Sequence, residues 1–320
     1  MEQKAAYDYR SQIDWITLPC DGGVPNVETF SPTPREQDRL IEEIATCWKL
    51  TELVRKGGSR KLHGNNGVEE DEIRAAWRRW ITSHFAFFTE FAILGSLYER
   101  STDYAARAAV TALQVCSERA SRLWAGSGAL MRYGIDFSPT EQIYKNYIRA
   151  QMPAAFSGEW IREWAALNAK QQSWRSLGTK LPAQSSGAWK SADERLRAGE
   201  CSYHRHHKAV MVACVPEMES LAMKHERKYG ALDISEQQFA IYDDWFRLRR
   251  SSQVSISEYV ETACSVFSEL LGDVLAGTRL DEGSLRELSE GIQAALATMA
   301  AWLGSLSPSS KHYPKALRGE

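Results

Sequence analysis

Apolar residues recur at steps of three and four along most of this 320-residue chain. This spacing places side chains along one face of an α-helix. It is clearest from Glu69 through Trp77 and His84 to Phe91 or Leu94, where the apolar band is too broad for a helix with one exposed side. No alternating β-branched run, strand–helix–strand rhythm or internal repeat is found. The sequence therefore predicts an all-α fold with a central helix in this region.

Proline and glycine divide the chain into three parts. Residues 1–33 contain Pro25, Pro32 and the run Cys20-Asp-Gly-Gly23, so we expect an irregular N-terminal arm. Residues 34–304 carry the helical pattern and form one predicted helical domain. Residues 305–320 are polar and predict a flexible tail.

Within the domain, turn residues set the expected helix ends. Gly126-Ser-Gly128 is expected to end one helix, and the Gly- and Ser-rich segment 176–191 is expected to form a loop long enough to act as a lid. Ser255 and Glu258 have the spacing of a capping box. The predicted helices cover residues 34–56, 69–94, 103–125, 139–151, 160–174, 192–229 (with a break near Pro216), 236–250, 255–277 and 282–303.

Composition excludes several classes of protein. Lysine and arginine number 39 against 41 aspartate and glutamate, so the chain lacks the basic surface that binds nucleic acid. No stretch approaches the roughly 18 apolar residues of a membrane span. The start, Met1 to Lys4, does not resemble a signal peptide, and the six cysteines form no Cys-x-x-Cys pair, so we expect reduced thiols and a cytoplasmic location.

The seven histidines are the first candidates for chemistry. His63, His225 and His312 lie in polar segments and are expected to be solvent-exposed. His84 lies among aromatic residues and needs a hydrogen-bond partner if it is buried, which Ser83 or a ligand could supply. Both a core histidine and a functional histidine fit this position.

A second candidate is the run from Tyr203 to Lys208, which contains three histidines. On a helix, His204 and His207 share a face, while His206 points elsewhere. The run is either a basic surface patch or the source of a ligand for a metal or haem iron. The apolar residues 209–215 favour a ligand, because they are expected to bury the adjacent turns. No histidine has a glutamate three residues before it, as di-iron bundles require, and zinc-protease, Walker and GxSxG motifs are absent.

Two short segments together resemble the tryptophan 2,3-dioxygenase superfamily. Trp80-Ile-Thr-Ser-His84 resembles its distal helix, and Tyr203-His-Arg-His-His207 resembles the segment whose last histidine binds haem iron. Between them, residues 130–137, 147–153 and 156–158 resemble the haem-dependent L-tyrosine hydroxylases of that superfamily, which act in natural-product (antibiotic) biosynthesis. The resemblance covers about residues 75–215.

This resemblance implies a non-covalent b-type haem, because the His-x-x-x-Cys attachment of a related methyltyrosine hydroxylase is missing. His207 would ligate the iron, with His204 as second choice. His84 would be catalytic, accepting the phenol proton or steering the peroxide. The expected reaction is hydroxylation of L-tyrosine, or a close analogue, at ring position 3 to 3,4-dihydroxyphenylalanine, with hydrogen peroxide or dioxygen as oxidant, in a homo-oligomer.

The same resemblance suggests residues that bind the substrate. Arg132 could pair with the amino-acid carboxylate through a bidentate contact. Further candidates for the pocket are Tyr133, Arg149, Phe85 and Phe88.

Two other functions stay open at this point. A dioxygenase acting on tryptophan or another indole would keep the fold and the haem. A helical binding protein without redox chemistry would leave His84 as a core residue and residues 203–208 as a surface patch.

Overall fold

The computed structural model describes residues 10, 13–26, 32–62, 68–153, 156–181, 183–217, 223, 226–228 and 235–304. Helices dominate this part of the chain, which confirms the predicted all-α class. His63, His225, His312, the tail 305–320 and most of the helix expected beyond Pro216 lie outside the described residues.

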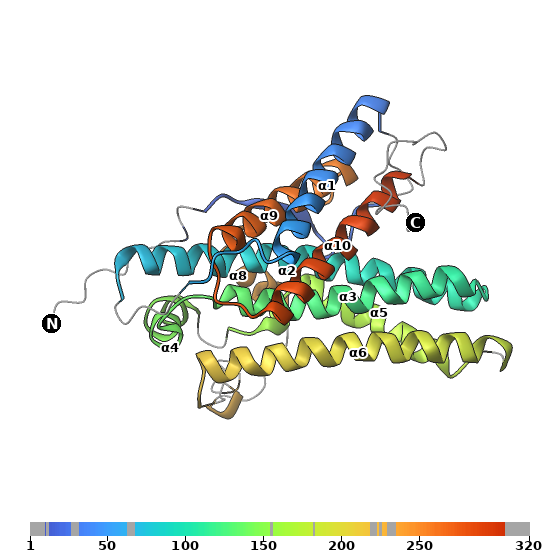
Figure 1. Ribbon diagram of the computed structural model, residues 1–320. Helices are drawn as coiled ribbons and strands as arrows, with labels where there is room; N and C mark the ends of the chain where they lie inside the picture. The colour runs from blue at the N-terminus through green and yellow to red at the C-terminus, as the bar shows by residue number, and fades with distance from the viewer. Residues whose placement is uncertain are drawn as a thin grey trace.

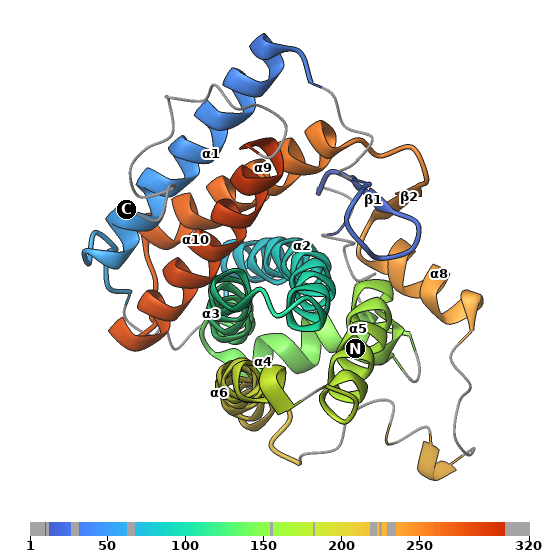
Figure 2. The ribbon, with the colours of Figure 1, turned by 90° about the vertical axis from the view of Figure 1, so that its right-hand side faces the viewer.

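Two long helices form the centre of the molecule. Helix α2 (Glu70–Ala106) and helix α3 (Val110–Gly134) run side by side and are seen nearly end-on in Figure 2. Helix α2 is longer than predicted and buries side chains around most of its circumference between Ile81 and Tyr98. Its first turn carries Glu70, Asp71 and Glu72, which complement the positive end of the helix dipole. The expectation of a central helix is therefore confirmed.

Three helices lie on one side of this pair and run obliquely to it, two packed directly against the pair and the third packed on those two (Figure 1). They are α1 (Pro34–Arg55), α9 (Ile256–Ala276) and α10 (Glu282–Gly304). Thr33 caps α1 by accepting a hydrogen bond from the Glu36 amide at 3.2 Å. The capping box predicted at Ser255 and Glu258 is formed at the start of α9. These three helix positions agree with the sequence pattern.

The other side is covered by α5 (Arg162–Gly178) and α6 (Ala183–Cys214), with α8 (Glu236–Trp245) beside α5 (Figure 2). Between α3 and α5 the chain forms a short helix α4 (Thr140–Ile143), one π-helical segment (Tyr144–Ile148) and two 3₁₀ turns (Arg149–Gln151 and Gly158–Trp160). A π-helical turn is rare and often occurs at functional sites.

The predicted end of a helix at Gly126-Ser-Gly128 is wrong, because α3 continues through it to Gly134. The glycines serve close packing instead. A methyl group on Gly126 would lie 2.5 Å from the Cα atom of Gly291 in α10, and one on Gly128 would lie 2.8 Å from the His206 ring in α6. The local sequence pattern predicts that these glycines end the helix. In the structure they are needed because the neighbouring helices cross too closely for a side chain at either position.

The predicted lid at 176–191 is also wrong. Helix α5 extends to Gly178 and α6 begins at Ala183, which leaves only a short connection. The Trp189 ring packs against Trp174 at 5.5 Å and over Gly178, where a side chain would collide with it. Burial of this aromatic pair stabilises the first turns of α6, which contain the weak helix formers Ser185, Ser186 and Gly187.

The N-terminal arm is not wholly irregular. Strand β1 (Ile16–Pro19) pairs in parallel with strand β2 (Leu248–Ser251), so the helix predicted for 236–250 ends early, at Trp245. The Arg250 side chain donates to the Pro19 carbonyl at 3.2 Å and binds Glu163 and Asp243. Strands of four residues are too short to show an alternating pattern, and their pairing is long-range.

No helix in the described part of the chain is long and apolar enough to cross a membrane.

Candidate active site

His84 lies in the middle of α2 with its two ring nitrogens in different situations. Nδ1 is 2.6 Å from the backbone carbonyl of Trp80 and 3.5 Å from the Ser83 hydroxyl, which itself donates to that carbonyl. Since a carbonyl only accepts, Nδ1 carries the proton and Nε2 has a free lone pair. Nε2 makes no hydrogen bond with any described residue. Burial lowers the pKa of His84 to about 4, so the ring is neutral at physiological pH.

Aromatic rings surround this imidazole. The Phe246 ring stacks on it at 4.4 Å, and Phe88 and Phe87 lie at 6.1 and 6.5 Å between ring centres. Trp80 lies 4.5 Å away, and its buried indole N–H has no partner among the described residues. Phe85, also suggested by the sequence, is buried but makes no ring contact with His84 in the part of the chain described.

His207 lies on α6, on the same face as Tyr203. The two rings are nearly parallel with centres 6.3 Å apart, and Tyr203 in turn stacks on Phe87 at 6.1 Å. His207 is exposed at the surface of α6, and neither ring nitrogen bonds any described residue. Partial burial, followed by the neighbouring His204, lowers the pKa of His207 and favours a neutral imidazole. A neutral ring with free nitrogens is the form that binds a metal.

The other two histidines of this run are placed differently. His206 is buried, and its Nε2 pairs with Glu287 of α10 at 2.5 Å, while Ser202 donates to the same carboxylate at 3.0 Å. It therefore joins α6 to α10. His204 is exposed and touches only the edge of the Tyr203 ring, at 5.3 Å.

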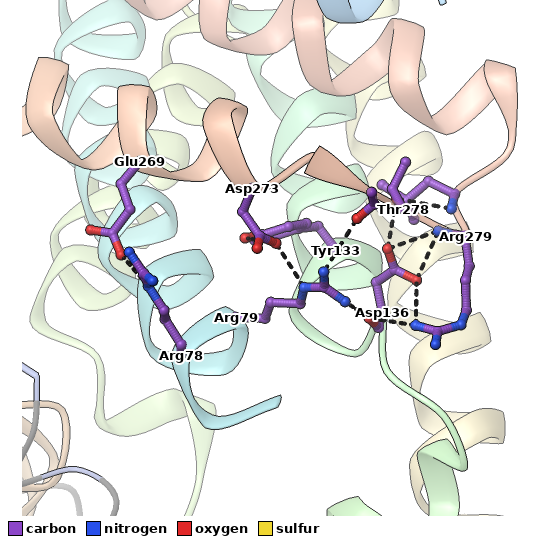
Figure 3. Close-up of polar contacts among 10 residues, drawn as sticks. Arg78, Arg79, Tyr133, Asp136, Glu269, Asp273, Thr278 and Arg279 are labelled. Atoms are coloured by element: carbon purple, nitrogen blue, oxygen red, sulfur yellow. Dashed lines mark hydrogen bonds and ion pairs between the residues drawn. The ribbon is translucent and has the colours of Figure 1, made fainter. Parts of the chain in front are cut away.

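Arg132 and Tyr133 lie at the end of α3, and each has a protein partner. Arg132 binds Asp281 and Ser284, both at 3.0 Å, at the start of α10. The Tyr133 hydroxyl donates to Asp273 at 3.0 Å, and this carboxylate also accepts from Arg79 at 2.7 Å. Figure 3 shows Tyr133 and Arg79 directed toward Asp273, near the end of α9.

The junction of α9 and α10 contains a buried polar network (Figure 3). Arg79 also donates to the backbone carbonyls of Asp136 and Gly277. The Asp136 carboxylate accepts from the Thr278 hydroxyl at 2.6 Å and from the Arg279 amide at 3.0 Å. The network fixes the first half of α2, one turn before His84, to the ends of α3 and α9.

Arg149, the remaining predicted substrate contact, forms an ion pair with Glu217 at 3.0 Å. The structure therefore brings His84, Phe88 and the Tyr203–His207 pair around one aromatic region. It places Arg132, Tyr133 and Arg149 in contact with acidic protein partners.

Sequence reasoning missed three residues of this region, namely Tyr144, Tyr242 and Phe246. Tyr144 begins the π-helical turn and lies 5.4 Å from Trp80. Tyr242 packs 4.6 Å from Phe246, which contacts His84 from the end of α8. The four-residue step between Tyr242 and Phe246 was visible, but nothing local connects residue 246 with residue 84.

A separate open cleft of about 660 Å³ lies between the two strands and the first turns of α9. It is lined by Asp14, Trp15, Ile16, Thr17, Ser251, Gln253, Val254, Glu258, Glu261, Thr262 and Ser265. None of these is a site residue suggested by the sequence.

Within the described ranges, no group of three or more His, Cys, Asp or Glu side chains is arranged to hold a metal ion. A haem iron differs from such ions because a single protein ligand can hold it.

Comparison with protein families gives a match to part of the chain. Residues 58–188 match the SfmD 3-methyl-L-tyrosine peroxygenase family. The matched segment covers less than half of the chain and includes His84, Arg132, Tyr133, Tyr144 and Arg149, but it ends before Tyr203. Among curated proteins, no sequence matches this chain.

The match agrees in part with the resemblance found in the sequence. It supports a relation to peroxygenases of a tyrosine-type substrate, and hence an oxidoreductase, for the segment that carries His84. The name of the matched family refers to a methylated tyrosine as the substrate, whereas the sequence alone suggested L-tyrosine.

Proposed function

We propose that this protein is a haem-dependent peroxygenase that hydroxylates the ring of L-tyrosine or of a ring-methylated tyrosine, in natural-product biosynthesis. In the balanced reaction, the phenol and hydrogen peroxide give a catechol and water. With L-tyrosine, hydroxylation at position 3 gives 3,4-dihydroxyphenylalanine. The family match over residues 58–188 supports the peroxide and the tyrosine-type substrate.

The observation that carries the proposal is the state of His84. Its Nδ1 proton is held by the Trp80 carbonyl, and its Nε2 lone pair faces an aromatic environment with no protein partner. Such a nitrogen can accept the phenol proton of a bound substrate at neutral pH. His84 is only half-buried, and its Nε2 atom is not one of the described buried polar atoms that lack a partner, so a bound substrate can reach it.

The residues on α6 fit a haem. His207 has free ring nitrogens on a helix face between buried Tyr203 and buried Cys214, and it is the proposed iron ligand. His204 is the second choice, whereas the pairing of His206 with Glu287 gives that residue a structural role. When bound, the haem would supply the oxidising power that peroxide alone lacks.

The protein side of the reaction is binding, orientation and proton transfer. Phe88 and Phe246, next to His84, form an apolar wall against which an aromatic ring can pack. Phe85 is proposed to support this wall from within the core. Arg132, Tyr133 and Arg149 would reach a substrate only by exchanging their present partners Asp281, Asp273 and Glu217.

The test is a peroxide assay on the purified full-length protein supplied with haem. A Soret band is expected, and L-tyrosine or 3-methyl-L-tyrosine with hydrogen peroxide should give a product one oxygen heavier by mass spectrometry. His84→Ala should keep the Soret band and lose at least 100-fold in turnover. His207→Ala should lose haem, and the matched variant His204→Ala should retain it.

Three results would contradict the proposal. Absence of a Soret band after haem supplementation would favour a binding protein. Incorporation of two oxygen atoms into tryptophan would favour an indole dioxygenase. Undiminished turnover by the His84 variant would remove the residue from the mechanism.

A further inference from the structure

A chain of oxidisable side chains leads from the histidine run of α6 into the interior of the protein. The Tyr203 ring is nearly parallel to that of His207, with the ring centres 6.3 Å apart, and the His204 ring touches it edge-on at 5.3 Å. Trp124 of α3 contacts Tyr203 at 5.1 Å between ring centres. The indole N–H of Trp124 then donates to the hydroxyl oxygen of Tyr98 in α2 at 3.2 Å. Three aromatic side chains are therefore in continuous contact across α6, α3 and α2.

The last member of this chain has a proton acceptor. The Tyr98 hydroxyl donates to the Glu200 carboxylate at 2.7 Å, and the Gln171 side chain donates to the same carboxylate at 2.8 Å. Tyr98 is 1% exposed, whereas the Glu200 side chain is 17% exposed and also pairs with Arg175 at the surface. The phenol is therefore shielded from water, and its hydroxyl points to a group that can take its proton and exchange it with solvent.

The surroundings of Tyr98 suit the loss of one electron together with one proton. Burial, followed by the nearby Glu200 carboxylate, raises the pKa of Tyr98 far above its ordinary value, so the resting phenol is neutral. Removal of an electron makes a phenol strongly acidic, and the Tyr98 proton then has Glu200 as its acceptor. The oxygen left behind keeps two hydrogen bonds, from Trp124 at 3.2 Å and from Gln171 at 3.4 Å.

Two other buried tyrosines each lack one of these features. Tyr133 donates to the Asp273 carboxylate at 3.0 Å, but its ring contacts no aromatic ring of the described residues. Tyr259 contacts Trp302 at 6.2 Å, but its hydroxyl donates to a backbone carbonyl, which does not take up a proton at neutral pH. Tyr98 combines a carboxylate acceptor with contact to the aromatic chain.

We propose that Tyr203, Trp124 and Tyr98 form an electron path that removes oxidising equivalents from the haem when no substrate is bound, here named the Tyr98 path. The inference rests on the proposed function, because hydrogen peroxide acting at the haem is the oxidant. One electron moves from Tyr98 through Trp124 and Tyr203 to the peroxide-oxidised haem, which is reduced by one electron. The phenol O–H bond of Tyr98 breaks, and its proton moves to Glu200. Tyr98 becomes a neutral radical, and no other bond changes.

The path does not depend on which histidine binds the iron. The rings of His204 and His207, the two candidate ligands, both contact Tyr203. Tyr203 is therefore the first oxidisable side chain beyond the iron ligand in either case. All three members of the path are buried, which keeps a radical on them away from solvent.

Such a path protects the candidate active site. The rings of Trp80, Phe88 and Phe246 lie around His84, and an oxidant without a substrate attacks the nearest side chains. Tyr98 lies about 21 Å from His84 along the axis of α2, since a helix rises about 1.5 Å per residue. An oxidising equivalent held at Tyr98 is thus removed from the rings proposed to hold the substrate.

The experiment uses the full-length, haem-loaded protein and detects radicals by electron paramagnetic resonance after rapid freezing. Hydrogen peroxide is added without amino-acid substrate. Tyr98→Phe removes the source of the electron and proton, and Trp124→Phe interrupts the path. Glu200→Gln keeps a hydrogen-bond acceptor of the same size but cannot take up the proton. Tyr259→Phe is the matched control, because it removes an equally buried hydroxyl outside the path.

The wild-type protein should give a tyrosyl signal that changes when the protein is labelled with ring-deuterated tyrosine. Its high-field spectrum should show a hydrogen-bonded radical oxygen, because Trp124 and Gln171 donate to Tyr98. L-Tyrosine added before the peroxide should suppress the signal. Tyr98→Phe, Trp124→Phe and Glu200→Gln should each lose it, whereas Tyr259→Phe should retain it.

A second oxidant tests the path without haem. A photogenerated ruthenium(III) polypyridyl complex removes single electrons from the same full-length proteins as purified. The hydrogen-bonded tyrosyl signal should again appear in the wild type and be lost in Tyr98→Phe and Glu200→Gln. Thermal unfolding is followed for every variant, and Glu200→Gln decides the question if Tyr98→Phe does not fold.

The inference is overturned if folded Tyr98→Phe or Glu200→Gln keeps the wild-type signal, or if the Tyr259 control loses it equally. It is also overturned if the wild type gives no tyrosyl radical with either oxidant. A protein that hydroxylates tyrosine but forms no radical at Tyr98 would keep the proposed function and remove the path. A protein that binds no haem but forms this radical with the ruthenium oxidant would refute the proposed function and keep the electron path.

Discussion

The Nδ1–H group of His84 donates to the backbone carbonyl of Trp80, one helical turn earlier, across 2.6 Å. This contact sets the tautomer of the imidazole and directs its free Nε2 away from the helix backbone. The chemical state of the candidate catalytic residue is therefore decided by the helix that carries it.

The first prediction concerns the titration of His84. Burial lowers the pKa of its ring to about 4, so its NMR ring-proton signal should stay at the neutral position from pH 8 to about pH 5. Comparison with His84→Ala assigns the signal. A midpoint near the ordinary value of about 6.5 would mean that water reaches the ring freely.

The second prediction compares two neighbouring arginines at the start of α2. Arg79 is buried and bonds Asp273 and the carbonyls of Asp136 and Gly277, whereas Arg78 pairs with Glu269 on the surface (Figure 3). Arg79→Ala leaves several acceptors without donors and should lower the free energy of unfolding by about 3 kcal/mol.

The matched variant Arg78→Ala removes an exposed pair and should change this free energy by less than about 1 kcal/mol. Urea denaturation measures both variants. Equal losses would show that the buried network does not hold the junction of α2, α3 and α9 together.

The third prediction concerns Glu90, which is fully buried in α2 and accepts from Ser127 at 2.6 Å, with its second oxygen unpartnered. Burial raises its pKa from 4.5 to about 8. In the unfolded chain, Glu90 therefore loses its proton at a lower pH than in the folded protein. The stability that comes from the neutral acid is complete below pH 4.5 and is lost as the pH rises toward 8.

Relative to Glu90→Gln, which stays neutral, the wild type should lose about 1.4 kcal/mol per pH unit in that window. Urea denaturation at several pH values gives this difference and cancels the other titrating groups. A constant difference between the two proteins would show that Glu90 is ionised in the folded state.

The fourth prediction compares two helical glycines. A Cβ atom on Gly95 in α2 meets nothing within 4 Å, whereas one on Gly126 in α3 lies 2.5 Å from the Gly291 Cα atom. Gly95→Ala should raise the free energy of unfolding by about 0.5–1 kcal/mol through helix propensity. Gly126→Ala should lower it by about 1–3 kcal/mol, because α3 and α10 must separate. Thermal unfolding distinguishes these opposite signs, and a stabilised Gly126 variant would contradict the close crossing.

The sequence by itself determined the helical class and the positions of most helices. Three- and four-residue spacing and the capping box at Ser255 are local signals, since each depends on residues within about one turn. The same kind of signal singled out His84 and the run ending at His207, because a histidine in an aromatic helix and three clustered histidines are unusual compositions.

Tertiary structure decided what these signals meant. Gly126 allows a close helix crossing instead of ending the helix, because Gly291 lies opposite it. Segment 176–191 is largely helical because Trp189 packs against Trp174. Phe246 stacks on His84 from 162 positions along the chain, and the rings of Tyr144, Tyr203 and Tyr242 pack against the neighbours of His84 from three separate elements. Contacts between residues so distant in sequence arise only when the helices pack. The candidate site consists of such long-range contacts, and no local sequence pattern predicts them.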